Sequence, residues 1–345
     1  MTEHGALYRK YRPQNFAEVR DQEHIVKVLE GAISKGTIPH ALLFSGTRGT
    51  GKTTMARIFA AAIGTSSVDL YEMDAASNRG IDDIRELKDA VHTVPYESKY
   101  KVYIIDEVHM LTKDAFNALL KTLEEPPAHV VFILATTEEE KILDTILSRC
   151  QVFRFRSPSR AVLAKIVTEV AKQEGFTLGA DAADLIAIAA DGSFRDALGV
   201  TQKVMLASGD TVGSADEVAL IIGAPRSALL SSLLTALHSK DTNAALTAVA
   251  EAAAAHVDMK LFARLLLEQI RAIMLLRHQP SKAASILSAF APEAKAIVAK
   301  LAEEKVSPIN SQLLLRFLIA TEQVSRSPLP HLPLEIAIME LNPQA

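Results

Sequence analysis

The sequence predicts an α/β domain with a parallel sheet, followed by a small helical domain and an all-helical C-terminal domain. Up to about Phe155, short apolar runs rich in β-branched and aromatic residues alternate with helical patterns. After Ser157 the strand pattern disappears, and the remaining chain is rich in alanine, leucine and isoleucine at helical spacing. With 345 residues, 49% hydrophobic and 23% charged, the composition is that of a globular protein of two or three domains.

Five apolar runs are expected to form buried strands, because parallel strands covered on both faces read as continuous apolar segments. These runs are Ala41–Phe44, Leu70–Met73, Val102–Ile105, Val130–Ala135 and Val152–Phe155. Segments with 3.6-residue apolar spacing lie around and between them, at Asp21–Ser34, Thr53–Ile63, Ile81–Val91 and Lys113–Leu123. This alternation predicts a parallel sheet with helices on both faces.

Beyond the sheet we expect helices alone. Ser159 is a candidate N-cap for a helix that runs to about Gln173, with Gly175 just past its end. Ala224-Pro225 then interrupts the helical pattern. The expected domains are an α/β core at residues 1–156, a helical domain at 157–223 and a second helical domain at 224–345.

Composition excludes several classes of protein. The net charge of −4 and a pI near 6.2 exclude a globally basic nucleic-acid binder, although a local basic strip stays possible. One cysteine excludes an intrachain disulfide and a zinc site built on several cysteines. The first residues lack the apolar segment of a secretory signal, and no run of about 18 apolar residues predicts a membrane span, so we expect a cytoplasmic protein.

The strongest motif is a phosphate-binding loop. The residues Gly46-Thr47-Arg48-Gly49-Thr50-Gly51-Lys52-Thr53 match G-x-x-x-x-G-K-[ST], and Thr54 follows them. A predicted strand precedes the loop and a predicted helix follows it, a context that a chance glycine-rich turn lacks. The pattern therefore predicts nucleotide binding, with Lys52 on the β- and γ-phosphates and Thr53 as a ligand of Mg²⁺.

Two carboxylates follow the third predicted strand. Asp106 and Glu107 are expected at the carboxyl edge of the sheet, where open α/β sheets bind ligands. We expect Asp106 to contact Mg²⁺ and Glu107 to act as the base that polarises the attacking water. A solvated acidic turn is the alternative, and the phosphate loop upstream makes it the weaker one.

A set of segments resembles one family, the ATP-binding clamp-loader subunits (gamma/tau) of bacterial DNA polymerase III. The segments are Tyr8–Pro13, Phe44–Gly49, Asp74–Asn78, Lys101–Leu111, Phe116–Pro127 and Ile146–Cys150. The resemblance covers about residues 6–205 closely. It implies an AAA+ P-loop core, and it implies that the two helical domains are a lid and an oligomerising collar.

The resemblance also implies roles for further residues. Arg149, in Ser148-Arg149-Cys150, matches the arginine finger that reaches the ATP of a neighbouring subunit. Thr136, with Thr137 as the alternate, matches the sensor of the γ-phosphate, although a threonine pair at a strand end is also a common N-cap. Arg195 matches the lid arginine that closes on the chain's own ATP, and a surface charge pair with its neighbour is the alternative.

Weaker inferences concern adenine, DNA and metals. The resemblance places Arg12 and Val19 beside the adenine. Asn78, Arg79 and Lys113 lie near the starts of two predicted helices and are candidates for contact with DNA phosphates, although a solvated face explains them equally well. Three scattered histidines lack metal spacing and are expected to be packing or surface residues: His40, His109 and His129.

Taken together, we expect an ATP- and Mg²⁺-dependent motor subunit of the bacterial replicative clamp loader. Its expected partners are the delta and delta-prime subunits, further copies of itself, the sliding clamp and primer–template DNA, in a nucleoid-associated replisome and with no membrane. One alternative is a nucleotide-dependent scaffold that does not hydrolyse ATP. Another is a different AAA+ DNA motor, such as a branch-migration helicase, which would need a winged-helix domain with strands after residue 157.

The chain departs from the family pattern in one place. The family usually carries a four-cysteine zinc module between the helix after the phosphate loop and the next strand. Here Ile63 is followed by Gly64-Thr65-Ser66-Ser67, and Cys150 alone cannot replace the module, so no zinc is expected. The sequence also stops at Ala345, before the tau-like tail, so we do not expect direct tethering of the polymerase.

Overall fold

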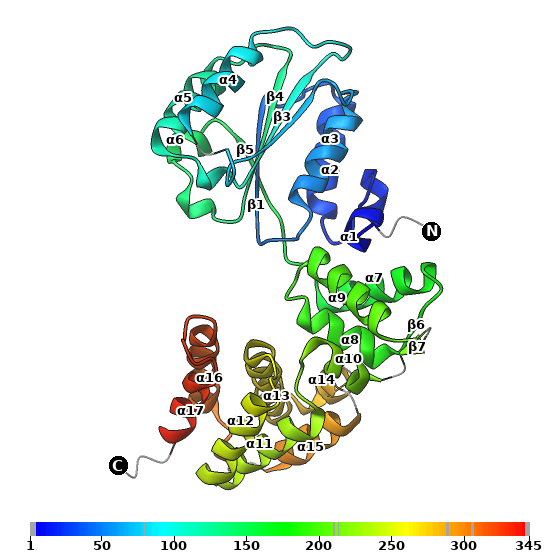
Figure 1. Ribbon diagram of the computed structural model, residues 1–345, viewed down its shortest axis with the longest axis vertical. Helices are drawn as coiled ribbons and strands as arrows, with labels where there is room; N and C mark the ends of the chain where they lie inside the picture. Colours follow the sequence, from blue (N-terminus) through cyan, green and yellow to red (C-terminus); the bar gives the residue numbers. More distant parts are fainter. Residues whose placement is uncertain are drawn as a thin grey trace. The chain divides into compact units, whose positions relative to one another are not determined.

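The computed structural model describes residues 5–341 except 79, 210, 213, 288–289, 291 and 305–306. The chain forms two compact units. The first runs up to Leu163 and takes in Ala190–Gly199, and the second contains Ala164–Ala189 and the chain from Val200 onward (Figure 1). The middle part of the chain therefore contributes to both units, and the three-domain division stays a prediction.

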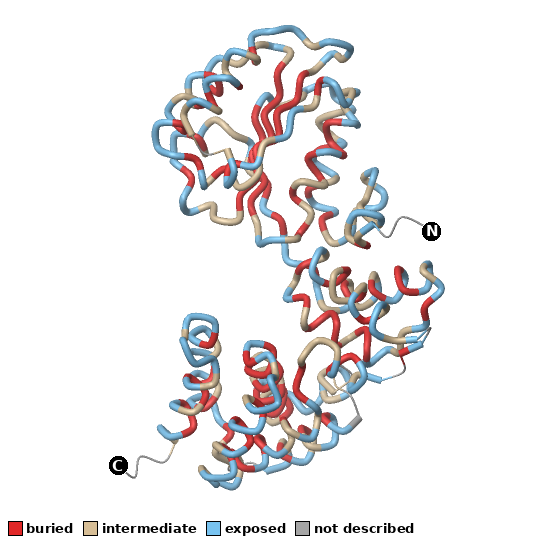
Figure 2. The backbone as a smooth tube through the Cα atoms, in the orientation of Figure 1, coloured by how far each residue is buried: buried red, intermediate tan, exposed pale blue. Residues whose placement is uncertain are grey.

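The first unit is built on a five-stranded parallel sheet with the order β2-β3-β4-β1-β5. The strands are β1 Ala41–Ser45, β2 Leu70–Asp74, β3 Lys101–Asp106, β4 Val130–Thr136 and β5 Gln151–Arg154. Each lies within one residue of its predicted limits, so the predicted α/β class is confirmed. The three central strands are almost wholly buried, as Figure 2 shows.

Helices cover both faces of this sheet, as predicted (Figure 1). Adjacent residues of β1 face opposite layers: Leu42 packs with Ile25 and Phe59, whereas Leu43 packs in the other layer with Ile84 and Leu119. The helices of this unit are α1 Leu7–Lys10, η1 Phe16–Glu18, α2 Glu23–Ser34, α3 Lys52–Ala62, α4 Ile81–Val91, η2 Val108–Met110, α5 Lys113–Glu124, η3 Glu139–Lys141 and α6 Asp144–Leu147.

The register of the sheet brings the predicted site residues to one edge. Ser45 pairs with Thr136, and the Gly46 N–H donates to the Thr136 carbonyl at 3.2 Å. Asp106 ends β3, which is the other neighbour of β4. The phosphate loop, the acidic pair and the threonine pair therefore follow three neighbouring strands at the carboxyl edge, where ligands of open α/β sheets bind.

The second unit is mainly helical. Ser159 accepts a bond from the Val162 N–H at 3.3 Å and caps α7, which ends at Gln173 as predicted. Its elements are α7 Arg160–Gln173, β6 Thr177–Leu178, α8 Ala180–Ala189, α9 Phe194–Ala207, β7 Thr211–Val212, α10 Ala215–Ile222, α11 Ser227–Ser239, α12 Thr242–Ala254, α13 Met259–His278, η4 Pro280–Lys282, α14 Ala283–Leu287, α15 Pro292–Glu303, α16 Ser311–Val324 and α17 Leu332–Met339. The first turn of α7 and the part of α9 up to Gly199 belong to the first unit.

The expectation that no strand follows residue 157 is wrong. The two-residue strands β6 and β7 pair in parallel, with Thr177 opposite Thr211 and Leu178 opposite Val212. The Gly179 N–H adds a bond to the Val212 carbonyl at 2.8 Å. A two-residue strand is too short to show a period in the sequence, so the pattern could not reveal it.

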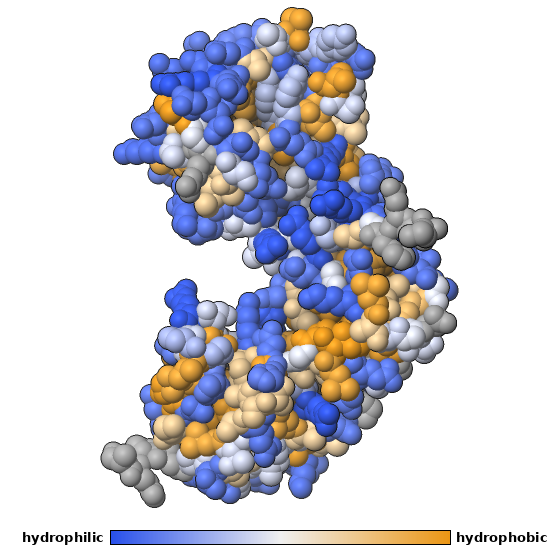
Figure 3. Space-filling view, in the orientation of Figure 1, coloured by the Kyte–Doolittle hydropathy of each residue, from blue (hydrophilic) through white to orange (hydrophobic). Residues whose placement is uncertain are grey.

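The C-terminal helices carry exposed apolar side chains, which Figure 3 shows as orange areas over α16 and α17. They include Leu315, Leu318, Ile319, Ile336 and Met339.

Among the described residues, no single helix has the length and hydropathy of a membrane span. The helices α10 and α11 pass this test only as a pair, and the pair is bent by 91°.

Candidate nucleotide site

The phosphate loop takes a backbone path that two glycines make possible. Gly46 has a φ of +150°, and a β-carbon there would lie 2.7 Å from the Phe155 carbonyl oxygen. Gly49 has a φ of +76°, and its β-carbon would meet the Ser193 hydroxyl at 1.9 Å. The Phe194 N–H also donates to the Gly49 carbonyl at 2.9 Å. The residues just before Arg195 therefore pack directly on the loop.

Lys52 begins α3 and is only 6% exposed. Its ammonium donates to the carbonyls of Gly46 at 2.7 Å and Thr47 at 2.9 Å. Burial lowers the pKa of Lys52, while the nearby carboxylates of Glu107 and Asp106 act in the opposite direction. The loop carbonyls thus hold a buried cation at the start of α3, where a phosphate-binding loop carries the lysine that contacts the phosphates.

Thr53 and Asp106 are far apart in sequence but meet at the sheet edge. The Thr53 hydroxyl donates to Asp106 Oδ2 at 2.6 Å, and Asp106 Oδ1 accepts from the Glu107 N–H at 2.9 Å. A hydroxyl and a carboxylate oxygen are the hard ligands that Mg²⁺ prefers. The chemistry of these two side chains therefore fits the predicted ion, and their role as its ligands stays a prediction.

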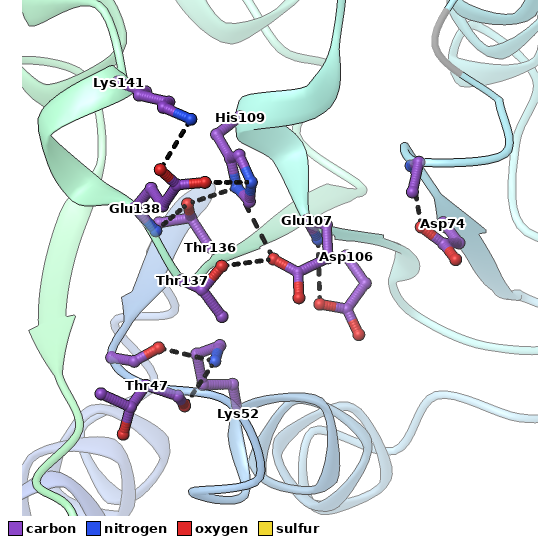
Figure 4. Close-up of polar contacts among 12 residues, drawn as sticks. Thr47, Lys52, Asp74, Asp106, Glu107, His109, Thr136, Thr137, Glu138 and Lys141 are labelled. Carbon is purple, nitrogen blue, oxygen red and sulfur yellow. Dashed lines mark hydrogen bonds and ion pairs between the residues drawn. The ribbon is translucent and has the colours of Figure 1, made fainter. Parts of the chain in front are cut away.

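Glu107 adopts an unusual backbone conformation for a residue with a side chain, with φ +49° and ψ +43°. Such conformations cost about 1–3 kcal/mol and persist where the surrounding structure enforces them. Its Oε2 atom accepts a bond from the Thr137 hydroxyl at 3.0 Å. Figure 4 shows this carboxylate beside Thr137, with Asp106 next to it and Lys52 close by.

The two threonines of the pair differ in their surroundings. Thr136 is fully buried, and its hydroxyl is 2.9 Å from His109 Nδ1 and accepts from the Glu138 N–H at 3.0 Å. Thr137 is half-buried and contacts Glu107 instead. The geometry therefore favours Thr137, the alternate, over Thr136 as the threonine that faces a bound phosphate.

A further cation, Arg195, acts on Lys52. The Arg195 guanidinium lies 5.9 Å from the ring centre of Tyr8, and its positive charge lowers the pKa of both Lys52 and Arg12. For Arg12 the largest cause is burial, followed by repulsion from Arg57 and then Arg195. Like charges gathered in this way suit an anionic ligand such as a nucleotide phosphate.

Arg149 has a different environment. Its guanidinium donates to the Thr145 carbonyl at 2.6 Å and the Ser148 hydroxyl at 3.2 Å, and it forms an ion pair with Glu124 at 2.6 Å. These partners belong to α5, α6 and the residue after α6. Within the described part of the chain, Arg149 makes no polar contact with the phosphate loop.

The weaker candidates stay predictions. Val19 is partly buried against the layer of α2 and α3. Asn78 donates to the Asp74 carbonyl at 3.1 Å, and Lys113 is the exposed first residue of α5. Arg79 lies outside the described residues.

Two residues that contact the candidate site, Ser193 and His109, were not predicted to do so from the sequence. Ser193 packs against Gly49 although the two residues are far apart in the sequence, so no local pattern could predict their contact. His109, expected to be a packing or surface residue, has a side chain only 5% exposed and contacts Thr136 and Glu138. The sequence offered one indication of this role, the position of His109 two residues after Glu107.

Cys150 is half-buried, and burial raises the pKa of its thiol to about 11.

The fold and the site together define a protein of the AAA+ ATPase class. The solved structure of RuvB, the Holliday junction branch migration motor of Thermotoga maritima, has the same fold, with a TM-score of 0.53 and 22% identity over 66% of this chain and 79% of RuvB. Residues 64–159 match the family described as DNA polymerase III, delta subunit, and residues 214–343 match DNA polymerase III subunits gamma and tau domain III. The chain belongs to the gamma/tau family of DNA polymerase III subunits.

Curated relatives support this assignment along most of the chain. DNA polymerase III subunit tau of Bacillus subtilis is 43% identical over 71% of this chain and 47% of its own length. Subunit tau of Escherichia coli is 35% identical over 95% of this chain and 53% of its own length. The chain therefore spans about half the length of these relatives.

Proposed function

We propose that this protein is the ATP-driven motor subunit of a bacterial replicative clamp loader, which opens a sliding clamp and loads it onto primer–template DNA. The observation that carries the proposal is the connected set of contacts at the sheet edge. Thr53 is bonded to Asp106, Asp106 to the Glu107 N–H, and the Glu107 side chain to Thr137. An intact set of this kind, beside the buried Lys52, supports hydrolysis rather than nucleotide binding alone.

The chemistry follows from the placement of these side chains. Glu107 would orient the attacking water and accept its proton, since its carboxylate is held by Thr137 at the edge of the site. Lys52 and Arg195 would stabilise negative charge on the phosphates of ATP. Thr53 and Asp106 would hold Mg²⁺, whose charge would neutralise the phosphate oxygens. Residues Gly46–Thr54 would supply backbone donors to the phosphates, with Arg12 and Val19 beside the adenine.

The site would be completed by a neighbouring subunit. Arg149 is bound to Glu124 rather than to the phosphate loop, which supports a role on the ATP of another subunit. We therefore propose that the chain assembles with delta, delta-prime and further copies of itself in the cytoplasm. The C-terminal helices would form the collar, and Asn78, Arg79 and Lys113 remain candidates for DNA contact.

Steady-state ATP hydrolysis tests this proposal. The chain is mixed with its partner subunits, the clamp and primed DNA are added in turn, and the Lys52→Ala variant serves as control. We expect low turnover that rises strongly when both clamp and primed DNA are present. Turnover indifferent to both would indicate another AAA+ machine, and ATP binding without turnover would indicate a nucleotide-dependent scaffold.

A further inference from the structure

We infer that His109 is a positioning residue for ATP hydrolysis, because it fixes both neighbours of Thr137 and so holds Thr137 against Glu107. The inference rests on the proposed ATPase function. His109 lies in η2, two residues after Glu107 and on the opposite side of the threonine pair from the phosphate loop in Figure 4. His109 thus connects the short helix after β3 with the last residue of β4 and the loop that follows it.

His109 contacts the two residues that precede and follow Thr137 in the sequence. Its Nδ1 atom is 2.9 Å from the Thr136 hydroxyl, and its Nε2 atom is 3.1 Å from Glu138 Oε1. The Glu138 N–H also donates to the Thr136 hydroxyl, which closes the set of bonds. The side chains on either side of Thr137 therefore both contact one imidazole ring, while the Thr137 hydroxyl itself donates to Glu107.

The contacts of His109 are compatible with the tautomer that carries a proton on Nε2. An ionised Glu138 can only accept, so Nε2 must carry the proton that it receives. The Thr136 hydroxyl accepts from the Glu138 N–H and has its own proton available for Nδ1. Lys141, bonded to Glu138 at 2.6 Å, is the main cause of a lowered pKa of Glu138, which keeps that carboxylate ionised.

These contacts restrict the position of the Glu107 carboxylate. His109 Nδ1 lies 3.6 Å from Glu107 Oε2, too far for a hydrogen bond but close enough to limit where the carboxylate can move. The directed bond to Glu107 comes from Thr137 at 3.0 Å. His109 thus acts on the hydrolytic carboxylate through the threonine, and a small displacement of such a group lowers a rate steeply.

The test compares three variants of His109 in the full chain with partner subunits, clamp and primed DNA. His109→Ala removes both contacts, His109→Asn keeps an acceptor near the Nδ1 position, and His109→Gln keeps a donor near the Nε2 position. We expect His109→Ala to lower kcat by about 10- to 100-fold. The Kd for ATP should change less than about threefold, and the Asn and Gln variants should fall between Ala and the wild type. His92→Ala, at an exposed histidine, is the matched control and should match the wild type.

A crystal structure of His109→Ala provides the second readout, which needs no turnover. We expect the bond between Thr137 Oγ1 and Glu107 Oε2 to be lost while the phosphate loop stays unchanged. Unchanged kcat, or a retained bond in the variant structure, would overturn the inference. A parallel loss of kcat, ATP binding and melting temperature in all three variants would also overturn it, because it would show a merely structural role. A wild type without turnover would instead refute the proposed function.

Discussion

The two arginines that the family resemblance singled out lie in opposite surroundings. Arg195 is next to residues packed on the phosphate loop, and its charge acts on Lys52 and Arg12. Arg149 is held at the corner of α5 and α6 by Glu124 and by a backbone carbonyl. The comparison shows that one arginine acts on the lysine of the phosphate loop and that the other is bound elsewhere, which is the difference expected from the proposed role of Arg149 on the ATP of a neighbouring subunit. Hydrolysis would then depend on assembly, because no single chain holds every charge that the transition state needs.

The largest expected effect comes from the phosphate-loop side of the comparison. Lys52→Ala removes a buried ammonium that holds the loop carbonyls of Gly46 and Thr47. We expect ATP turnover to be abolished and ATP binding to be strongly weakened, as measured by steady-state hydrolysis and titration with a fluorescent nucleotide. Full turnover in this variant would show that the loop is not the ATP site.

Arg149→Ala tests the arginine that is bound away from the phosphate loop. We expect nearly unchanged ATP binding by the chain, but a loss of about 10³–10⁵ in the stimulated turnover of the assembled complex, the range for an arginine supplied in trans. Parallel binding and turnover measurements on the isolated chain and on the complex separate the two effects. The assignment fails if the complex of this variant hydrolyses ATP at the normal rate.

Glu107→Gln separates chemistry from binding within the site. The amide keeps the size of the side chain but cannot accept the proton of the attacking water, so turnover should fall by about 10²–10⁴. ATP affinity should stay within a few-fold of the wild type in an equilibrium titration. If affinity is lost together with turnover, Glu107 serves the binding of the nucleotide and not its hydrolysis.

Glu124→Gln tests whether the ion pair with Glu124 restrains Arg149. The ion pair with Arg149 is partly exposed, and such pairs contribute about 0.2–1 kcal/mol. Releasing the arginine should therefore raise stimulated turnover of the complex by no more than about fivefold and should leave turnover of the isolated chain unchanged. A large loss of turnover would mean that Glu124 positions Arg149 instead of restraining it.

The smallest expected effect on turnover is at a residue that belongs to neither region. Asp69 accepts backbone N–H bonds from Tyr96, Glu97 and Ser98, at 2.6, 2.9 and 2.8 Å. Burial acts to raise the pKa of Asp69, but these donors outweigh it and lower the pKa to about 2, from an ordinary value of 3.8.

Because this pKa is depressed in the folded state, the stabilising effect of Asp69 is complete above the ordinary value and is lost as the pH falls from about 4 to about 2. Asp69→Asn should lower the melting temperature by a few degrees at neutral pH, and the difference from the wild type should shrink across that window. ATP turnover at neutral pH and moderate temperature should be unchanged. A constant difference in melting temperature at every pH would contradict this account.

The sequence predicted the sheet and most of the site because both depend on local patterns. Buried strands appear as apolar runs, and the phosphate loop and the pair Asp106-Glu107 are contiguous motifs. What it could not predict arises from contacts between distant segments. The packing of Ser193 on Gly49, the choice between Thr136 and Thr137, and the role of His109 all depend on how strand ends and loops meet in three dimensions.

Mixing two inactive variants tests most directly whether the site is shared between subunits. Lys52→Ala retains Arg149, and Arg149→Ala retains the phosphate loop, so a complex that contains both could form a complete site at the boundary between them. We expect each variant alone to show almost no stimulated ATP turnover and the mixture to recover a measurable fraction of the wild-type rate. Turnover in the mixture no higher than in either variant alone, with assembly of the mixed complex verified, would contradict the account.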